Sequence, residues 1–400
     1  MKRVDELQVL LNDLPVGTLT LRSGELSEFR LAESYLNTFP RPVLGQQFID
    51  RPREAYRSRV RVPPWFSNLL PEGPLRELVA NQAGVPSGRE FHLLHFLGED
   101  LPGAVRILGT SALQLALPNL EFDTSSSGFE EGLRFSLAGV QLKFSARRHE
   151  RGLTIPAQGR DGDWIVKLPD ARFANVPENE FATMAWAAAS GLRVPETALV
   201  ELSSVSGLPA SVHSLPERKA YAVRRFDRSP DGRIHTEDMA QVLGVFADRK
   251  YDAANYETVA SIVLAVAGVG ELRELLRRLV FVIASGNGDA HLKNWSFMYS
   301  PGGDAKLSPA YDLVSTIQYL PNDLLALNLS RSKAWTDVSV QSFTRLARRL
   351  AVDERTVVDT VHAAVHDIRE GWRTVRRQAG FTAEQQRRLE SHMSAIPLLQ

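Results

Sequence analysis

Apolar residues recur at two different spacings in this 400-residue sequence, one near its start and the other in its later part. This division constrains the fold more than any other feature. Residues 4 to 31 alternate between apolar and polar side chains, with turn signals at Asn12-Asp13 and Ser23-Gly24, which is typical of a small antiparallel sheet. From about residue 235 onward, apolar residues recur mainly at helical spacing, as on one face of residues 353 to 369. Strand patterns followed by a helical block predict an α+β fold with two lobes.

Further patterns divide the chain into domains. Residues 62 to 84 begin with prolines and continue at helical spacing to Gly84, and a second helix is expected from Gly88 to about Leu97. Residues 118 to 132 form a polar connector rich in Ser and Gly, and we place the first boundary there. We expect three parts: an N-terminal α/β subdomain at 1–118, a strand-rich part at 119–232 and a mostly helical part at 233–400.

The strand-rich part combines short strands with one helix. The helix runs from Glu178 to Ala189, where apolar side chains at helical spacing precede Gly191. The expected strands lie at residues 133–137, 141–146, 164–168 and 221–226. This part and the helical part are the two lobes of the expected fold.

Bulk composition limits the classes of protein and of chemistry. Apolar residues make up 44% of the chain, which is enough for a sizeable core. The 47 basic and 47 acidic residues give a formal net charge of zero, so the charge balance does not indicate a nucleic-acid or membrane ligand. The absence of cysteine excludes disulfides, thiolate metal sites and cysteine nucleophiles.

The N-terminal residues lack the features of an export signal. Charges interrupt the first apolar stretch, and no small-residue cleavage site follows it. The longest apolar runs, near residues 260–270 and 279–284, are shorter than the about 20 residues that span a bilayer. We therefore expect a soluble protein of the cytoplasm without a membrane partner.

A cluster of polar residues follows the second of these apolar runs. Four residues separate Asp289 from Asn294, and Asp312 comes after a short strand pattern and a turn. Phosphoryl transfer requires a carboxylate that takes the proton of the nucleophile, and oxygen ligands that hold Mg²⁺ against nucleotide phosphates. Protein kinases supply these groups as D-x-x-x-x-N followed by a metal-binding Asp, in the order found here. His291 and Lys293 lie in the same loop, where Lys293 could offset phosphate charge.

Residues upstream favour a kinase over an ordinary polar loop rich in turn-forming Asp and Asn. Lys167 interrupts an apolar strand, where its charge needs a partner. Kinases pair such a lysine with nucleotide phosphates and with a helix glutamate, and Glu178 and Glu180 follow on the next helix. The turn at Ala138-Gly139 could present backbone N–H groups to phosphates, although a plain hairpin is an alternative. Residues 221–228 stand where kinases have the hinge between lobes.

Together these segments resemble the HipA family of bacterial serine/threonine kinases, which are the toxins of toxin–antitoxin pairs. The resemblance covers essentially the whole chain and implies a two-lobed protein-kinase-like fold. The segments that carry it are FSNLLPEGPLR (66–76), LGEDLPGAVRIL (97–108), SLAGVQLKFS (136–145), WIVKLP (164–169), ENEFATMAWAAASGL (178–192), RRFDR (224–228), HTEDMAQVLG (235–244), GNGDAHLKN (286–294) and SPAYDLVST (308–316).

The resemblance implies catalytic and metal-binding roles for the polar cluster. Asp289 would be the catalytic base, and His291 and Lys293 would complete the catalytic loop. Asn294 and Asp312 would bind Mg²⁺.

The resemblance also implies an ATP site and self-inactivation. Lys167 would bind the ATP phosphates, and the backbone from Arg224 to Phe226 would hold the adenine edge, although family members often carry an acidic residue in place of Arg224. Ser136 falls at the position of autophosphorylation, where a phosphate could eject the loop and switch the kinase off. The other residues implied to contact ATP are Ser136, Ala138, Gly139, Val140, Gln141, Arg225, Asp227, His291, Asn294 and Tyr311.

The family also implies partners and a biological role. Its substrates include aminoacyl-tRNA synthetases, whose phosphorylation on a serine stops growth, and its partner is a small helix-turn-helix antitoxin, HipB. Because the sequence has no clear helix-turn-helix, we expect contact with operator DNA mainly through such an antitoxin. Two alternatives stay open: a catalytically weak scaffold that acts as co-repressor with an antitoxin, and a small-molecule kinase.

Overall fold

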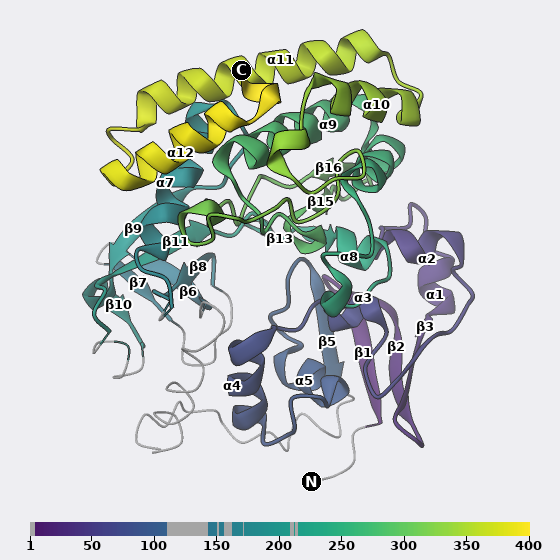
Figure 1. Ribbon diagram of the computed structural model, residues 1–400. Helices are drawn as coiled ribbons and strands as arrows, with labels where there is room; N and C mark the ends of the chain where they lie inside the picture. The colour runs from purple at the N-terminus through teal and green to yellow at the C-terminus, as the bar shows by residue number, and fades with distance from the viewer. Residues whose placement is uncertain are drawn as a thin grey trace. The chain divides into compact units, whose positions relative to one another are not determined.

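The computed structural model describes residues 5–109, 143–149, 152–155, 162–170, 172–208, 212 and 215–400. They form two compact units, each assembled from separate stretches of the chain, which Figure 1 colours by residue number. The first unit comprises Met1–Ala174, Val200–Ala247 and Met298–Asp304, and the second comprises Asn175–Leu199, Asp248–Phe297 and Ala305–Gln400. The expected domain boundaries at residues 118 and 232 stay a prediction, because residues 110–142 lie outside the described part.

The first unit begins with the predicted antiparallel sheet. Its order is β4-β3-β2-β1-β5, and its inner face buries Leu7, Leu19 and Phe29, which lie opposite one another in register. The alternation of residues 4 to 31 therefore identified three real strands. The strands are β1 (Glu6–Leu11), β2 (Leu14–Arg22), β3 (Leu26–Leu31), β4 (Tyr56–Arg59) and β5 (Val105–Gly109).

Short helices cover this sheet and complete the N-terminal core. The expected helix end at Gly84 is confirmed, since α4 ends there and Gly84 adopts the left-handed conformation with φ of 64°, which glycine adopts without steric cost. The expected second helix is α5. The helices are α1 (Glu33–Leu36), α2 (Gln46–Asp50), α3 (Pro64–Ser67), α4 (Gly73–Ala83) and α5 (Glu90–Leu97).

A second sheet, with the order β10-β7-β6-β8-β11-β9, carries the predicted ATP lysine. The central strand β8 pairs antiparallel with β6 on one side and with β11 on the other, which confirms the strands expected near residues 164–168 and 221–226. The strand expected at 133–137 lies outside the described residues. The strands are β6 (Lys143–His149), β7 (Gly152–Thr154), β8 (Trp164–Lys167), β9 (Thr197–Glu201), β10 (Val205–Ser206) and β11 (Lys219–Arg224).

Short elements follow β11 in the first unit. They are β12 (Arg228–Ser229), β13 (Gly232–Arg233), β14 (His235–Asp238) and α8 (Met239–Val242). Asp238 caps α8, because its side chain accepts from the backbone of Gln241 while the Gln241 side chain accepts from the backbone of Asp238.

The second unit is mostly helical, as expected. The long helix α11, at the top of Figure 1, packs on α7 and α9. Trp186 of α7 lies at the centre of this contact, with its ring centroid 5.0 Å from Phe281 and 4.8 Å from Trp372. The helices are α7 (Val176–Ala189), α9 (Tyr256–Ser285), α10 (Val340–Leu350), α11 (Glu354–Val375) and α12 (Ala383–Ala395).

Two further features after residue 256 depart from regular helix. Gly268 interrupts α9, because its φ of 81° is not helical. A short pair of strands, β15 (Ser296–Tyr299) and β16 (Ala305–Leu307), follows the loop after α9, so the strand pattern expected before Asp312 is real. Within the ranges that the structure describes, no helix is both long and apolar enough to cross a membrane.

A buried glutamate joins distant segments of the first unit. Glu237 accepts hydrogen bonds from the Gln46 backbone N–H (3.1 Å), the Trp65 indole (2.8 Å) and the Tyr299 hydroxyl (2.8 Å). Burial raises the pKa of Glu237 from 4.5 to about 7, against the lowering effect of these donors. Its proton is therefore expected to be lost within the physiological pH range.

This raised pKa predicts a specific dependence of stability on pH. The native state retains the proton of Glu237 up to about pH 7, whereas the unfolded glutamate loses it near 4.5, so ionisation costs stability as pH rises through this window. Glu237→Gln has no charge to lose and should gain stability relative to the wild type between pH 5 and pH 8, by up to about 3 kcal/mol. Urea unfolding at several pH values measures the difference.

The control for this prediction is Glu6→Gln, which removes the same charge from an exposed strand position. It should change stability by less than about 0.5 kcal/mol at every pH. A difference between wild type and Glu237→Gln that stays constant from pH 5 to pH 8 would contradict the raised pKa.

Candidate active site

The predicted catalytic loop begins directly after the end of α9. Gly286 ends the helix in the left-handed conformation, with φ of 60°, and the chain then turns into the loop that carries Asp289. Two hydrogen bonds close this loop on the Asp289 carbonyl, from the His291 backbone N–H (2.7 Å) and the Asn294 side-chain amide (2.8 Å). Because the Asn294 nitrogen is used in this way, its amide oxygen is the atom left to bind a metal.

The buried side chain of Asn287 connects this loop with the segment that carries Asp312. Its oxygen accepts from the Asp289 backbone N–H at 3.0 Å, and its nitrogen lies 3.4 Å from the Asp312 carbonyl. Thr316 adds to the connection, since its hydroxyl accepts from the Gly288 backbone N–H at 2.7 Å. The structure therefore brings the predicted residues Asp289 and Asp312 together through Asn287, which the sequence analysis did not select.

Asp312 itself has an unusual backbone conformation. Its φ is 53°, a region that aspartate tolerates better than most residues with a side chain but that still costs energy. Such conformations concentrate at functional sites, where surrounding contacts hold them. This is consistent with a role for Asp312 beyond a turn.

The side chain of Asp289 is accessible and contacts two aromatic residues. Its exposed fraction is 47%, and the Tyr251 hydroxyl donates a hydrogen bond to its Oδ1. The Nε2 atom of the buried His291 lies 3.9 Å from the same oxygen, and the ring of His291 contacts Tyr251 edge-on at 5.0 Å between centroids. The sequence analysis missed Tyr251, because it lies 38 residues before Asp289 in a segment without a motif.

Buried groups hold the backbone of the catalytic loop. The Tyr256 hydroxyl and the Trp295 indole both donate to the Ala290 carbonyl at 3.1 Å, and burial raises the pKa of Tyr256. Tyr311, which was expected to contact ATP, uses its hydroxyl to donate to the Lys293 carbonyl at 2.7 Å. These bonds position the loop independently of any ligand.

The predicted Mg²⁺ ligands fit that ion by their chemistry. Asn294 offers an amide oxygen and Asp312 a carboxylate, and Mg²⁺ takes one or two such protein oxygens together with water and substrate phosphates. Among the described residues, no three His, Asp or Glu side chains gather as a metal cage.

The first unit positions the predicted ATP lysine. Lys167 is buried near the end of β8, with its ammonium 5.5 Å from the ring centroid of Tyr221. Lys143 on β6 lies directly opposite Lys167 in register, and like charges at such positions repel each other. Lys143 was missed, because strand register is not visible in one sequence.

Arg225 and Asp227, which were expected to contact ATP, belong to a buried network of charges. Arg225 donates to both oxygens of Asp227, from Nε to Oδ1 and from Nη2 to Oδ2, each at 2.9 Å. Asp227 also accepts from Arg228 and from the Gly103 backbone. Burial alone would raise the pKa of Asp227, but the Arg225 guanidinium holds it below its usual range. Asp100 joins the network through Arg228 at 2.7 Å. The side chains of Arg225 and Asp227 are therefore engaged in structural contacts, and their expected contact with ATP stays a prediction.

The remaining predicted residues fall into two groups, and only one of them is described. Ser136, Ala138, Gly139, Val140 and Gln141 lie outside the described residues. Arg224 is exposed at the end of β11.

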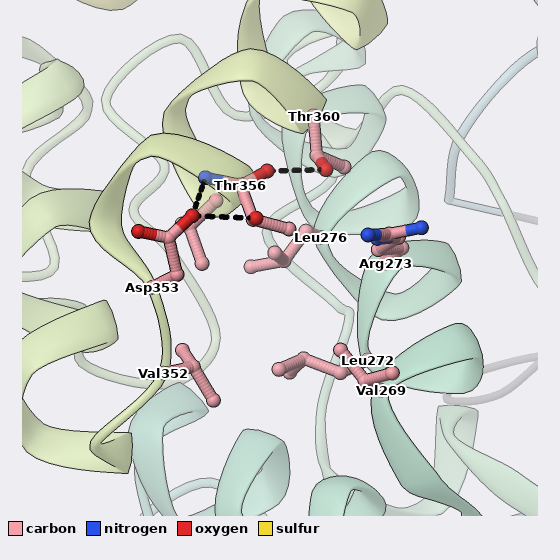
Figure 2. Close-up of a pocket in the computed structure, with 9 residues that line it drawn as sticks. Val269, Leu272, Arg273, Leu276, Val352, Asp353, Thr356 and Thr360 are labelled. Atoms are coloured by element: carbon pink, nitrogen blue, oxygen red, sulfur yellow. Dashed lines mark hydrogen bonds between the residues drawn. The ribbon is translucent and has the colours of Figure 1, made fainter.

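A small hollow in the second unit is separate from all of these residues. Figure 2 shows it between α9 and the start of α11, with a volume of about 210 Å³. Asp353 caps α11 there by accepting from the backbone N–H of Thr356 at 2.8 Å. The lining residues are Val269, Leu272, Arg273, Leu276, Val352, Asp353, Thr356, Val357 and Thr360.

The charge network predicts a large effect of Asp227→Asn on stability. The change would remove one of the two carboxylates that pair with the buried guanidinium groups of Arg225 and Arg228 and leave Asp100 as the other, which should lower the free energy of unfolding by about 3 kcal/mol. Urea unfolding measures this loss. The control is Asp13→Asn, because the Asp13 side chain is 95% exposed although it pairs with Arg106, and it should cost less than about 1 kcal/mol. Equal losses for both variants would contradict a structural role of the network.

The close approach at Gly288 predicts that a methyl group is not tolerated there. A Cβ atom at this position would overlap the Asp323 carboxylate and lie 2.6 Å from the Leu324 carbonyl. Gly288→Ala should therefore destabilise the protein by about 2 kcal/mol, as measured by urea unfolding. Gly302→Ala is the control, since the nearest atom there is Ser300 Oγ at 3.8 Å. Unchanged stability of Gly288→Ala would show that the loop can move aside.

A solved structure of the Shewanella oneidensis toxin–antitoxin system, with HipA, HipB and operator DNA, aligns with this chain at a TM-score of 0.75 and 20% sequence identity. The alignment covers 97% of this chain and 95% of the other. This likeness establishes a kinase-like α+β fold, as predicted.

Family models match most of the sequence. Residues 135–372 match the HipA-like C-terminal domain, and residues 7–108 match the HipA N-terminal domain. The chain therefore belongs to the HipA family, which confirms the resemblance found in its motifs.

Curated relatives carry kinase names. The protein "Putative kinase Y4dM" of Sinorhizobium fredii is 43% identical over 100% of this chain and 98% of its own length. The serine/threonine-protein kinase toxin HipA of Shewanella oneidensis is 26% identical over 72% of this chain and 76% of its own length.

Proposed function

We propose that this protein is a serine/threonine protein kinase that transfers the γ-phosphate of ATP to a protein. The observation that carries the proposal is the connection of Asp289, Asn294 and Asp312 through Asn287 and the loop hydrogen bonds. In the proposed site, Asp289 offers an accessible carboxylate, and Asn294 and Asp312 offer oxygen ligands of the kind that Mg²⁺ prefers. Membership of the HipA family and the kinase names of relatives support the same conclusion.

Each predicted site residue of the second unit has a defined task in the proposed reaction. The oxygen of the acceptor hydroxyl bonds to the γ-phosphorus, the bond from that phosphorus to the β,γ-bridging oxygen breaks, and ADP leaves with the electron pair. Asp289 takes the proton of the hydroxyl. Asn294 and Asp312 would hold Mg²⁺, which offsets the charge of the phosphates. His291 and Lys293 complete the loop, with Lys293 as a further cation.

Residues of the first unit serve the nucleotide in this proposal. Lys167 binds phosphate oxygens, and the register of the sheet adds Lys143 as a second cation. The backbone from Arg224 to Phe226 holds the adenine edge, while the segment from Ser136 to Gln141 covers the phosphates. Autophosphorylation of Ser136 then switches the enzyme off.

The proposal extends to partners and to cellular role. The Shewanella oneidensis neighbour is solved with HipB and operator DNA, and we propose a similar helix-turn-helix antitoxin for this chain, with DNA bound mainly through it. The proposed target is a serine of an aminoacyl-tRNA synthetase or of another translation component in the cytoplasm, so that phosphorylation stops growth.

Loss of either proposed carboxylate should abolish phosphate transfer without unfolding the protein. After incubation with Mg-ATP, intact mass and phosphosite mapping should find one phosphate on Ser136 of the wild type and none on Asp289→Asn or Asp312→Asn, because the base or a metal ligand is missing. Asp304→Asn, an exposed turn position, is the matched control and should be phosphorylated normally.

Two results would contradict parts of this proposal. Phosphorylation of both active-site variants at the wild-type rate would remove Asp289 and Asp312 from the mechanism. A Ser136→Ala protein that still shuts off through a phosphate elsewhere would remove the self-inactivation role of Ser136.

A further inference from the structure

The contact between Tyr251 and Asp289 places a hydroxyl on the proposed catalytic base. The Tyr251 hydroxyl donates a hydrogen bond to Oδ1 of Asp289. An acceptor serine must donate in the same way before its oxygen attacks the γ-phosphorus. The phenol of Tyr251 therefore makes the hydrogen bond to Asp289 that the acceptor hydroxyl would need to make.

The surroundings of Tyr251 separate an anchored backbone from an accessible side chain. The Tyr251 carbonyl accepts from the Lys333 ammonium at 3.1 Å, and the neighbouring Lys250 carbonyl accepts from the Leu292 backbone N–H at 3.2 Å. The side chain touches His291 edge-on, yet Tyr251 is 40% exposed. A rotation of the side chain can thus move the phenol away from Asp289 while the backbone stays attached to the catalytic loop.

We propose that Tyr251 gates the acceptor position of Asp289, so that the phenol excludes water until a protein hydroxyl displaces it. This inference rests on the proposed kinase function. It assigns to Tyr251 a role in specificity, namely the choice of a protein hydroxyl over water. Without the gate, water can attack the γ-phosphorus, transfer its proton to Asp289, and yield ADP and inorganic phosphate.

Hydrolysis of Mg-ATP tests the gate in proteins that carry Ser136→Ala, which removes the proposed self-acceptor, and without any protein substrate, with initial phosphate release as the readout. Tyr251→Phe keeps the ring against His291 but removes the O–H group. Its kcat for hydrolysis should rise roughly tenfold, since a hydrogen bond to a charged group contributes a factor of about this size. The KM for ATP should not change, because the gate acts on the acceptor. Tyr251→Ala should show at least the same rise, and circular dichroism checks that both variants are folded.

Matched variants test whether the increase in hydrolysis comes from the gate. Tyr319→Phe removes a hydroxyl that bonds to Asn179 in the same unit and should hydrolyse ATP at the wild-type rate. Tyr251→Phe combined with Asp289→Asn should lose the increase, because the gate acts through the carboxylate.

The outcomes distinguish the gate from the kinase proposal. Hydrolysis by Tyr251→Phe at or below the wild-type rate, with phosphate transfer still dependent on Asp289, would overturn the gate alone and show that the phenol only positions the base. If no variant hydrolyses ATP, and if Asp289→Asn leaves phosphate transfer at the wild-type level, both proposals are overturned.

Discussion

The buried amide of Asn287 is the interaction on which the candidate site depends. Its oxygen and nitrogen face the backbones of Asp289 and Asp312, which lie 23 residues apart in the chain. A buried amide of this kind is costly to leave without partners, so the two segments hold each other in place. The loop is held further by the hydroxyl of Tyr256 and the indole of Trp295. The proposed chemistry therefore sits on a loop that is organised before any ligand binds.

Two buried carboxyl groups elsewhere in the chain, those of Asp227 and Glu237, make structural contacts. Asp227 lies in a segment that the family resemblance assigned to ATP, yet its carboxylate is surrounded by guanidinium groups and a backbone N–H group. Glu237 is buried under three donors from distant segments. Both carboxyl groups lie inside segments that resemble the family and are held by structural contacts, so a motif alone does not separate catalytic from structural carboxylates.

Many of the described elements and the turn from Asp289 to Asn294 follow from local sequence patterns. Alternation marks the N-terminal sheet, and the left-handed helix end at Gly84 follows from glycine itself. The spacing from Asp289 to Asn294 predicted one loop, and one hydrogen bond between them closes it. By contrast, Lys143 and Tyr251 were missed. Lys143 depends on the register of β6 against β8, and Tyr251 depends on a contact over 38 residues.

The sequence by itself determined the local features, because alternation, helical spacing and a loop motif depend on neighbours within a few residues. It also determined the family, since several motifs recur in one order. The tertiary structure alone decided which residues lie together: Tyr251 bonded to Asp289, Lys143 opposite Lys167 in the strand register, and the partners of Asp227. Such contacts depend on strand register and on the packing of segments far apart in the chain, and neither leaves a periodic signal in a single sequence.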